Sequence, residues 1–191
     1  MGDKGKEMKL DQNLIYEDIS VICIYDDGST DTTSDYIRRF LPMFAAQGIH
    51  VLYKIGIVSR GVGFAKNRAA EMGRGRFLCF CDADDVSMPD RIQKQYDRAN
   101  ALESNGGLVF LGSGFRRDPI KSTERYTRWA NGLFKDDLRI QVHTSHGPTL
   151  IAPTWFISRM LYTILGGFEE KYQSGFPEDL EFFIVPSIQK M

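Results

Sequence analysis

The sequence predicts an α/β fold in which helices cover a mostly parallel sheet. Short, β-branched apolar runs alternate along the chain with segments whose apolar residues have helical spacing, a pattern typical of strand–helix units that build parallel sheets. Acidic residues follow two of the apolar runs directly. Because ligands bind at the carboxyl ends of the strands in such sheets, these acidic positions are the first candidates for a functional site.

The strands are predicted from apolar runs that end at turn signals. The run Ile19–Tyr25 is rich in β-branched residues and stops at Asp26-Asp27-Gly28-Ser29, a strong loop signal. By the same criteria, the remaining strands are predicted at 49–53, 77–81, 108–115 and 150–151.

The helices are predicted from apolar spacing and from residues that favour helix ends. One of the polar residues at 29–31 caps a helix that ends at Phe44. Pro89 favours the first turn of another helix, which reaches about Glu103. The segment 116–129 is polar and is predicted to be irregular. Further helices are predicted at 62–72, 138–142 and 153–165, and a last one opens at 177–179.

Length and charge indicate one globular domain without a strongly charged partner. The chain has 191 residues, of which 42% are hydrophobic, enough for a core of ordinary size. We predict a polar lead at 1–18, one domain at 19–185 and a tail at 186–191. The 24 basic and 25 acidic side chains leave a net charge of -1, so no global charge attracts nucleic acid or an anionic membrane.

Cysteine usage and the polar lead favour a reducing compartment. The three cysteines are an odd number without the spacing of a disulfide framework. Residues 1–18 contain no apolar run as long as a signal peptide or a membrane anchor. We therefore expect a cytoplasmic location.

The run Asp82-Ala83-Asp84-Asp85 is a first candidate for chemistry. Carboxylates crowded at a strand end repel one another, and a bound cation offsets that repulsion. Oxygen ligands suit Mg²⁺ or Mn²⁺ rather than zinc. The alternative is a solvated turn in which Asp85 caps the following helix.

Three other polar segments have both a functional and a purely structural interpretation. Asp26 and Asp27 could accept hydrogen bonds from a nucleobase and ribose, or belong to an ordinary turn. In the segment 61–68, two glycines open a helix near a lysine, an arrangement that can hold a diphosphate. One carboxylate of Glu178 and Asp179 could act as a general base, or the pair could simply complement a helix dipole.

Taken together, the order and spacing of these segments resemble glycosyltransferase family 2. The resemblance extends from Ile19 to Phe183. It implies the GT-A fold, a Rossmann-like sheet with flanking helices, and an inverting transfer of a sugar from a UDP-sugar to an acceptor hydroxyl. Its motifs are Asp-Asp-Gly-Ser-Thr-Asp at 26–31, the Gly-rich Lys-Asn segment at 61–68, Asp-Ala-Asp-Asp at 82–85, Gly-Gly-Phe at 166–168 and Glu-Asp at 178–179.

The resemblance also implies a role for each matching residue. Asp179 would be the catalytic base, with Glu178 as its catalytic neighbour. Asp84 would hold the metal ion, Mn²⁺ or Mg²⁺. The donor would be bound by a set of polar side chains: Asp26, Asp27, Lys66, Asn67 and Asp82.

A narrower resemblance, in the segments 116–129, 147–149 and 153–156, is to galactosyltransferases that act on queuosine in tRNA. The same subfamily is also described as β-1,3-N-acetylglucosaminyltransferase-like. The first description implies UDP-galactose as donor and tRNA as acceptor, and the second implies transfer of N-acetylglucosamine to a galactoside. Interleaved basic and aromatic residues suit single-stranded RNA. The acceptor candidates are Arg125, Trp129 and Trp155, although Trp129 could instead pack a solvated loop on the core.

The chain departs from the family pattern at both ends. Family members begin with a strand that helps to hold the nucleotide base, and they continue past the Glu-Asp helix. We therefore expect the first strand to be missing and the domain to be incomplete, which would expose a sheet edge. A non-catalytic relative that binds nucleotide or tRNA is the second hypothesis. The third, a sugar nucleotidyltransferase, would need a Gly-rich, Arg-containing loop after its first strand, and the sequence shows none.

Overall fold

The computed structural model describes residues 21–104, 106–145, 149–172, 178–179 and 181–182. Its described residues form two compact units. The terminal unit contains those within 21–76 and 159–182, and the central unit contains those within 77–158. The predicted domain boundaries at 18/19 and 185/186 lie outside the described residues. The prediction that a first strand is missing also concerns a part of the chain outside them.

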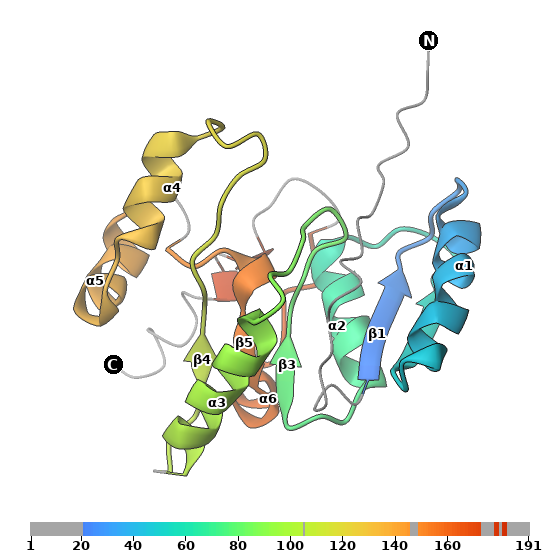
Figure 1. Cartoon of the computed structure of the whole chain (residues 1–191), viewed down its shortest axis with the longest axis horizontal. Coiled ribbons are helices and arrows are strands. Elements are labelled where there is room, and N and C mark those ends of the chain that lie inside the picture. Colours follow the sequence, from blue (N-terminus) through green and yellow to red (C-terminus); the bar gives the residue numbers. More distant parts are fainter. Residues whose placement is uncertain (1–20, 105, 146–148, 173–177, 180, 183–191) are drawn as a thin grey trace. The chain divides into compact units, whose positions relative to one another are not determined.

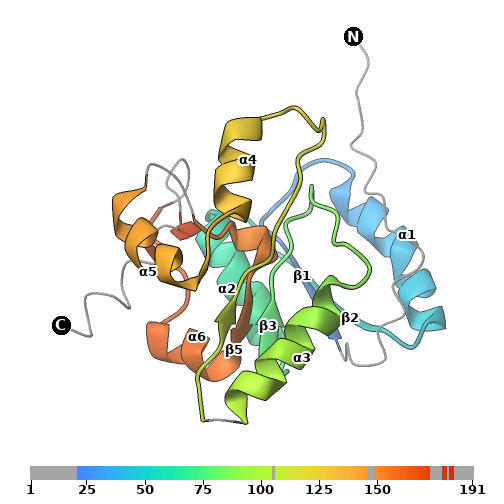
Figure 2. The same cartoon turned by 60° about the vertical axis from the view of Figure 1, so that its left-hand side comes forward.

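A parallel strand pair forms the sheet of the terminal unit. Strand β1 (Val21–Asp26) pairs with β2 (His50–Ile55) over six residues, from Val21 opposite His50 to Asp26 opposite Ile55. The connection between them is helix α1 (Thr33–Ala46), as a parallel pair requires a crossover. Figures 1 and 2 show α1 and helix α2 (Val62–Met72) on either side of β1.

Helices α2 (Val62–Met72) and α6 (Arg159–Leu165) complete the terminal unit. Arg159 joins them, because its Nη1 donates to the carbonyl of Ala70 at 2.9 Å and its Nε to the carbonyl of Gly75 at 2.6 Å. A cation at the C-terminal end of α2 also complements the helix dipole. Both strands and α2 lie close to their predicted positions.

The central unit is built on a small antiparallel sheet. Its strand order is β3 (Phe77–Cys79), β5 (Phe156–Ser158), β4 (Phe110–Leu111), and β5 runs antiparallel to both neighbours. Helix α3 (Arg91–Glu103) contributes Ala99 to a buried cluster with Val109 and Phe156. The remaining elements are α4 (Glu124–Asn131), α5 (Lys135–Thr144) and the short 3₁₀ helix η1 (Ala152–Thr154).

The α/β class is confirmed, but the prediction for 150–165 is wrong in detail. The predicted strand at 150–151 and helix at 153–165 are replaced by η1, β5 and a helix that starts only at Arg159. Pro153 opens a single 3₁₀ turn, and the apolar residues after it form a strand buried on both faces. The segment 116–129, predicted to be irregular, contains α4.

Within the described part of the chain, no helix is both long enough and apolar enough to cross a membrane.

Candidate functional site

Asp26, at the end of β1, is a buried carboxylate, 5% exposed. Its Oδ1 accepts the backbone N–H of Ser29 at 2.8 Å, and its Oδ2 accepts the hydroxyl of Tyr53 at 3.2 Å. The side chain therefore holds the turn after β1 and ties it to β2. The donor contact predicted for Asp26 stays a prediction.

Asp27 connects the same turn to the start of α2. Its Oδ2 accepts the hydroxyl of Ser59 at 2.9 Å and the backbone N–H groups of Arg60 and Gly61, each at 2.8 Å. Gly28 beside it has φ +80°, and a Cβ at that position would lie 2.9 Å from the carbonyl carbon of Val58. Asp27 therefore occupies N–H groups at the helix start where the sequence predicted a diphosphate.

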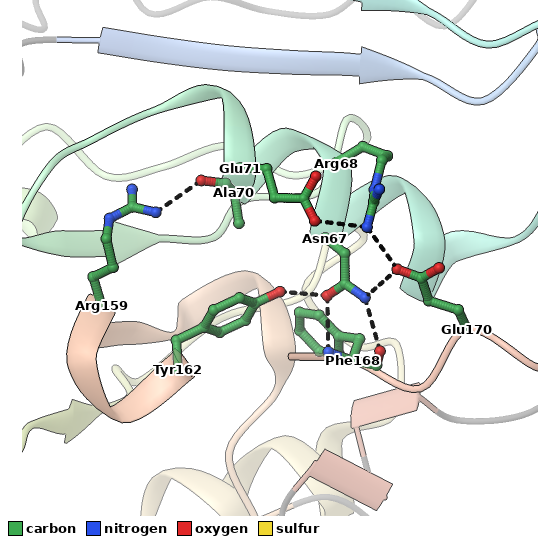
Figure 3. Close-up of polar contacts among 8 residues, drawn as sticks. All are labelled: Asn67, Arg68, Ala70, Glu71, Arg159, Tyr162, Phe168 and Glu170. Atoms are coloured by element: carbon green, nitrogen blue, oxygen red, sulfur yellow. Dashed lines mark hydrogen bonds and ion pairs between the residues drawn. The ribbon is translucent and has the colours of Figure 1, made fainter. Parts of the chain in front are cut away.

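Asn67 on α2 lies inside a hydrogen-bond cluster, 7% exposed (Figure 3). Its Oδ1 accepts the backbone N–H of Phe168 at 2.8 Å and the hydroxyl of Tyr162. Its Nδ2 donates to the carbonyl of Phe168 and to Oε1 of Glu170, both at 2.8 Å. These four bonds use the full capacity of a carboxamide. The predicted donor contact of Asn67 remains untested, and it would have to displace one of them.

The turn at Gly166-Gly167-Phe168 is shaped to fit this amide. Gly167 has φ +77°, and a Cβ there would lie 2.7 Å from Oδ1 of Asn67. Glu170, just after the turn, also accepts a bond from Nη2 of Arg68 at 3.0 Å. The sequence motif Gly-Gly-Phe therefore has a direct structural reason, which is close approach of the backbone to α2.

Lys66 and Glu178, two predicted site residues, form an ion pair. The Lys66 Nζ lies 2.8 Å from Glu178 Oε1, and the two side chains are only 12% and 14% exposed. Asp179, the predicted base, is the next residue and is also helical. The structure thus brings Lys66 and the Glu-Asp pair together, and their predicted roles stay predictions.

The acidic run after β3 belongs to the central unit. Asp82 is half-buried, whereas Asp84 and Asp85 are exposed. Partial desolvation of the Asp85 carboxyl raises its pKa, and the carboxylates of Asp82 and Asp84 raise it further. Arg117 and Arg91 act in the opposite direction. The loop thus carries net carboxylate repulsion, which a bound cation would relieve.

The chemistry of this loop fits a hard divalent cation with few protein ligands. Among the described residues, no group of three or more His, Cys, Asp or Glu side chains is arranged to hold a metal ion. A dedicated all-protein cage is therefore not what this loop provides. Mg²⁺ and similar ions are commonly held by one or two carboxylates together with substrate phosphates, and Asp84 with Asp82 or Asp85 is consistent with that mode.

Arg91 is a residue of this region that sequence reasoning missed. Its Nη2 donates to the carbonyl of Phe80 at 2.8 Å, and its Nε to Oε1 of Gln95 at 3.1 Å. It therefore anchors the start of α3 to Phe80, shortly before the acidic loop. The helical spacing of Arg91 and Gln95 was the only signal available. Tyr162 and Glu170 were also missed, and nothing local in the sequence indicates their contact with Asn67.

Two of the three acceptor candidates lie on the surface of the central unit. Arg125 and Trp129 line an open hollow of about 640 Å³ with Tyr126, whose ring centre is 5.8 Å from that of Trp129. Trp155 needs a correction, because it is 0% exposed and its Nε1 donates to the carbonyl of Leu150 at 3.1 Å. It is a core residue and cannot meet an acceptor in this conformation.

Comparison with known proteins identifies the family of the chain. Residues 10–164 match the family model described as glycosyl transferase family 2. A glycosyltransferase of Bacillus subtilis provisionally assigned to teichuronic acid biosynthesis is 35% identical over 114 residues, which are 60% of this chain and 43% of that protein. An uncharacterized glycosyltransferase of Rickettsia prowazekii is 27% identical over 186 residues, 91% of this chain and 52% of that protein. The chain thus spans about half the length of these relatives.

Solved structures share the fold. Staphylococcus aureus TarS, residues 1–349 in complex with UDP-GlcNAc, superposes with a TM-score of 0.59 at 16% identity, covering 84% of this chain and 42% of that one. A mannosyltransferase from Pyrobaculum calidifontis in complex with GDP-Man and Mn²⁺ gives 0.55 at 20% identity, covering 76% and 37%. At these identities the likeness establishes the GT-A fold alone.

Proposed function

The chain belongs to glycosyl transferase family 2, and from that premise we propose that it transfers a sugar from a nucleotide-sugar donor to an acceptor hydroxyl. The observation that carries the proposal is the acidic loop after β3, a turn closed by a bond from the Asp85 N–H to the Asp82 carbonyl at 3.1 Å. Partial desolvation, and then the carboxylates of Asp82 and Asp84, raise the pKa of Asp85 there. Folding alone gains nothing from that repulsion, whereas a cation bound with a nucleotide diphosphate would relieve it.

On the donor side, we assign the metal to Asp84, with Asp82 close to the ribose. A bound Mn²⁺ or Mg²⁺ would offset the charge that develops on the departing diphosphate. Asp27 supports a donor contact in the terminal unit, because its Oδ1 is buried and has no hydrogen-bond partner among the described residues. An N–H or O–H group on the nucleobase or ribose of the nucleotide-sugar would satisfy that oxygen.

Asp179 is proposed as the general base. Its carboxylate accepts the proton of the acceptor hydroxyl while that oxygen bonds to the anomeric carbon of the sugar. The bond from the anomeric carbon to the diphosphate oxygen breaks in the same displacement, so the nucleoside diphosphate leaves with the bonding electron pair. Attack from the face opposite the leaving group inverts the anomeric configuration.

The substrates are the finer part of the proposal. We favour UDP-galactose as donor and queuosine in tRNA as acceptor, with transfer of N-acetylglucosamine to a galactoside as the alternative. Five basic residues against two acidic ones at 116–128 support a negatively charged acceptor. Relatives named for teichuronic acid and poly(ribitol-phosphate) support an anionic polymer as acceptor instead. A cytoplasmic location stays a prediction from the sequence.

The test is a transfer assay on the purified chain with Mn²⁺. UDP-galactose, UDP-N-acetylglucosamine and GDP-mannose are offered as donors, with queuosine-containing tRNA or poly(ribitol phosphate) as acceptor. We expect an inverted product from one donor, and loss of transfer in Asp179→Asn but not in the control Asp97→Asn, an exposed carboxylate on α3. Formation of UDP-sugar from UTP and a sugar phosphate, without transfer, would instead identify a nucleotidyltransferase.

A further inference from the structure

Three successive side chains of α2 reach the same distant part of the chain. Lys66 pairs with Glu178, Asn67 binds the backbone of Phe168, and Arg68 binds Glu170. Their partners are more than 100 residues away in sequence. One turn of helix therefore holds the turn after α6 and the start of the segment that contains the predicted base (Figure 3 shows the Asn67 and Arg68 contacts).

Lys66 is the member of this group that faces a predicted catalytic residue. Its side chain is 12% exposed, its Nζ contacts Glu178 at 2.8 Å and also lies 5.5 Å from the centre of the Phe168 ring. An ammonium group this far out of water is held by its anionic partner and by the ring face. Glu178 and the ring face already occupy part of the surroundings of this ammonium group, so a diphosphate ligand would have to share Lys66 with Glu178.

The contacts at the start of α2 support the same conclusion. The N–H groups of Arg60 and Gly61, which would cradle a phosphate, already donate to Asp27 at 2.8 Å. The lysine and one N–H group at the helix N-terminus, that of the N-cap residue Gly61, are thus engaged by carboxylates of the chain itself.

We propose that Lys66 is a positioning residue that acts on Asp179 through Glu178, and not a ligand of the donor diphosphate. The inference rests on the proposed function, because Asp179 must be the base. Successive residues of a helix project about 100° apart, so fixing Glu178 against α2 sets the direction in which Asp179 projects. Removing Lys66 leaves the donor site intact and turns the base away from the acceptor hydroxyl.

The experiment compares Lys66→Met with wild type in two assays. UDP affinity is measured by calorimetry with Mn²⁺, and kcat and KM for the donor are measured by transfer. We expect unchanged UDP affinity and donor KM but a kcat lower by about 100-fold, the effect of misplacing a catalytic group by about 1 Å. Lys66→Arg keeps a cation opposite Glu178 and restores kcat in part. Lys54→Met, which removes an exposed lysine of β2, is the matched control and changes neither quantity.

The outcomes separate the two claims. A loss of UDP affinity of tenfold or more in Lys66→Met, about what one charged hydrogen bond supplies, with wild-type kcat at saturating donor, would overturn the positioning role and make Lys66 a donor ligand. Equal kcat values in wild type and Lys66→Met would overturn the positioning role as well. Absence of both nucleotide binding and transfer in the wild type would contradict the proposed function, and the inference with it. If Lys66→Met does not fold, the double variant Lys66→Met with Glu178→Gln removes the stranded carboxylate and serves in the same two assays.

Discussion

The contact between α2 and the Gly-Gly-Phe turn differs physically from the acidic loop after β3, although family resemblance assigns both to one site. In the first, Asn67 is 7% exposed and its amide has four partners. In the second, Asp84 and Asp85 are exposed, and partial desolvation together with like charges raises the pKa of Asp85. In the first region the amide of Asn67 is satisfied by other residues of the chain, whereas in the second the proposed cation would offset the repulsion.

Structural and functional polar residues can be separated by whether their bonding is satisfied within the chain. A polar side chain whose bonds are all satisfied internally contributes to stability, and its loss should unfold the protein before it changes chemistry. A group held in an unfavourable electrostatic environment contributes to binding, and its loss should spare stability. Four substitutions test this distinction.

Asn67→Ala should have the largest effect. It leaves the hydroxyl of Tyr162 and the N–H of Phe168 buried without their acceptor, and it opens a small cavity. We expect a loss of about 3–4 kcal/mol in the free energy of unfolding. Urea denaturation measures it, with Gln93→Ala on the exposed face of α3 as control. A loss no greater than that of the control would show that the cluster does not hold the unit together.

Asp84→Asn tests the behaviour expected of a binding residue, which is a loss of activity without a loss of stability. We expect transfer with Mn²⁺ to fall about 100-fold or more, because a metal contributes several kcal/mol to charge stabilisation in the transition state. Thermal stability should be kept or rise slightly, since the substitution removes a charge that repels Asp85. A variant that loses stability but keeps activity would assign Asp84 to the structural class.

Tyr162→Phe removes one hydrogen bond from the Asn67 cluster without removing a ring. The aromatic contact with Phe168, at 6.0 Å between ring centres, is retained. The expected cost is about 1–2 kcal/mol of unfolding free energy, because Oδ1 of Asn67 keeps the bond from the Phe168 N–H. Combining it with Asn67→Ala should give much less than the sum of the two losses, and strict additivity in that cycle would argue against a shared network.

Arg128→Ala should have the smallest effect. The pair with Glu124 on α4 measures 2.6 Å, but the two side chains are 75% and 62% exposed. Such surface pairs contribute about 0–1 kcal/mol, so the midpoint of thermal unfolding should barely change. A measurable drop in binding of tRNA or poly(ribitol phosphate), with stability kept, would indicate an acceptor role for this face of α4.

The parts of the fold that are locally encoded were predictable from sequence. The strand at 21–26 and the helix at 62–72 follow from apolar spacing and turn residues, and both are where expected. Strand β5 was assigned to a helix, because a short apolar run after a proline is ambiguous without knowledge of its neighbours.

Long-range partners decide the remaining differences. The contact of Asn67 with Tyr162 joins residues 95 positions apart, and that of Lys66 with Glu178 joins residues 112 apart. No local pattern specifies such pairs, so the motifs did not indicate these contacts, and the donor contacts predicted for Lys66 and Asn67 stay predictions. The prediction of Trp155 as an acceptor residue was wrong for a related reason, because the burial of this side chain depends on the packing of the whole central unit.

Calorimetric titration of UDP into the purified wild-type chain, with and without Mn²⁺, tests the central claim most directly. The account predicts binding that requires the metal and that disappears in Asp84→Asn, because the acidic loop and the diphosphate share one cation. Equal UDP binding with and without metal, or no binding by a folded sample under either condition, would contradict the claim that this loop forms part of a nucleotide-sugar site.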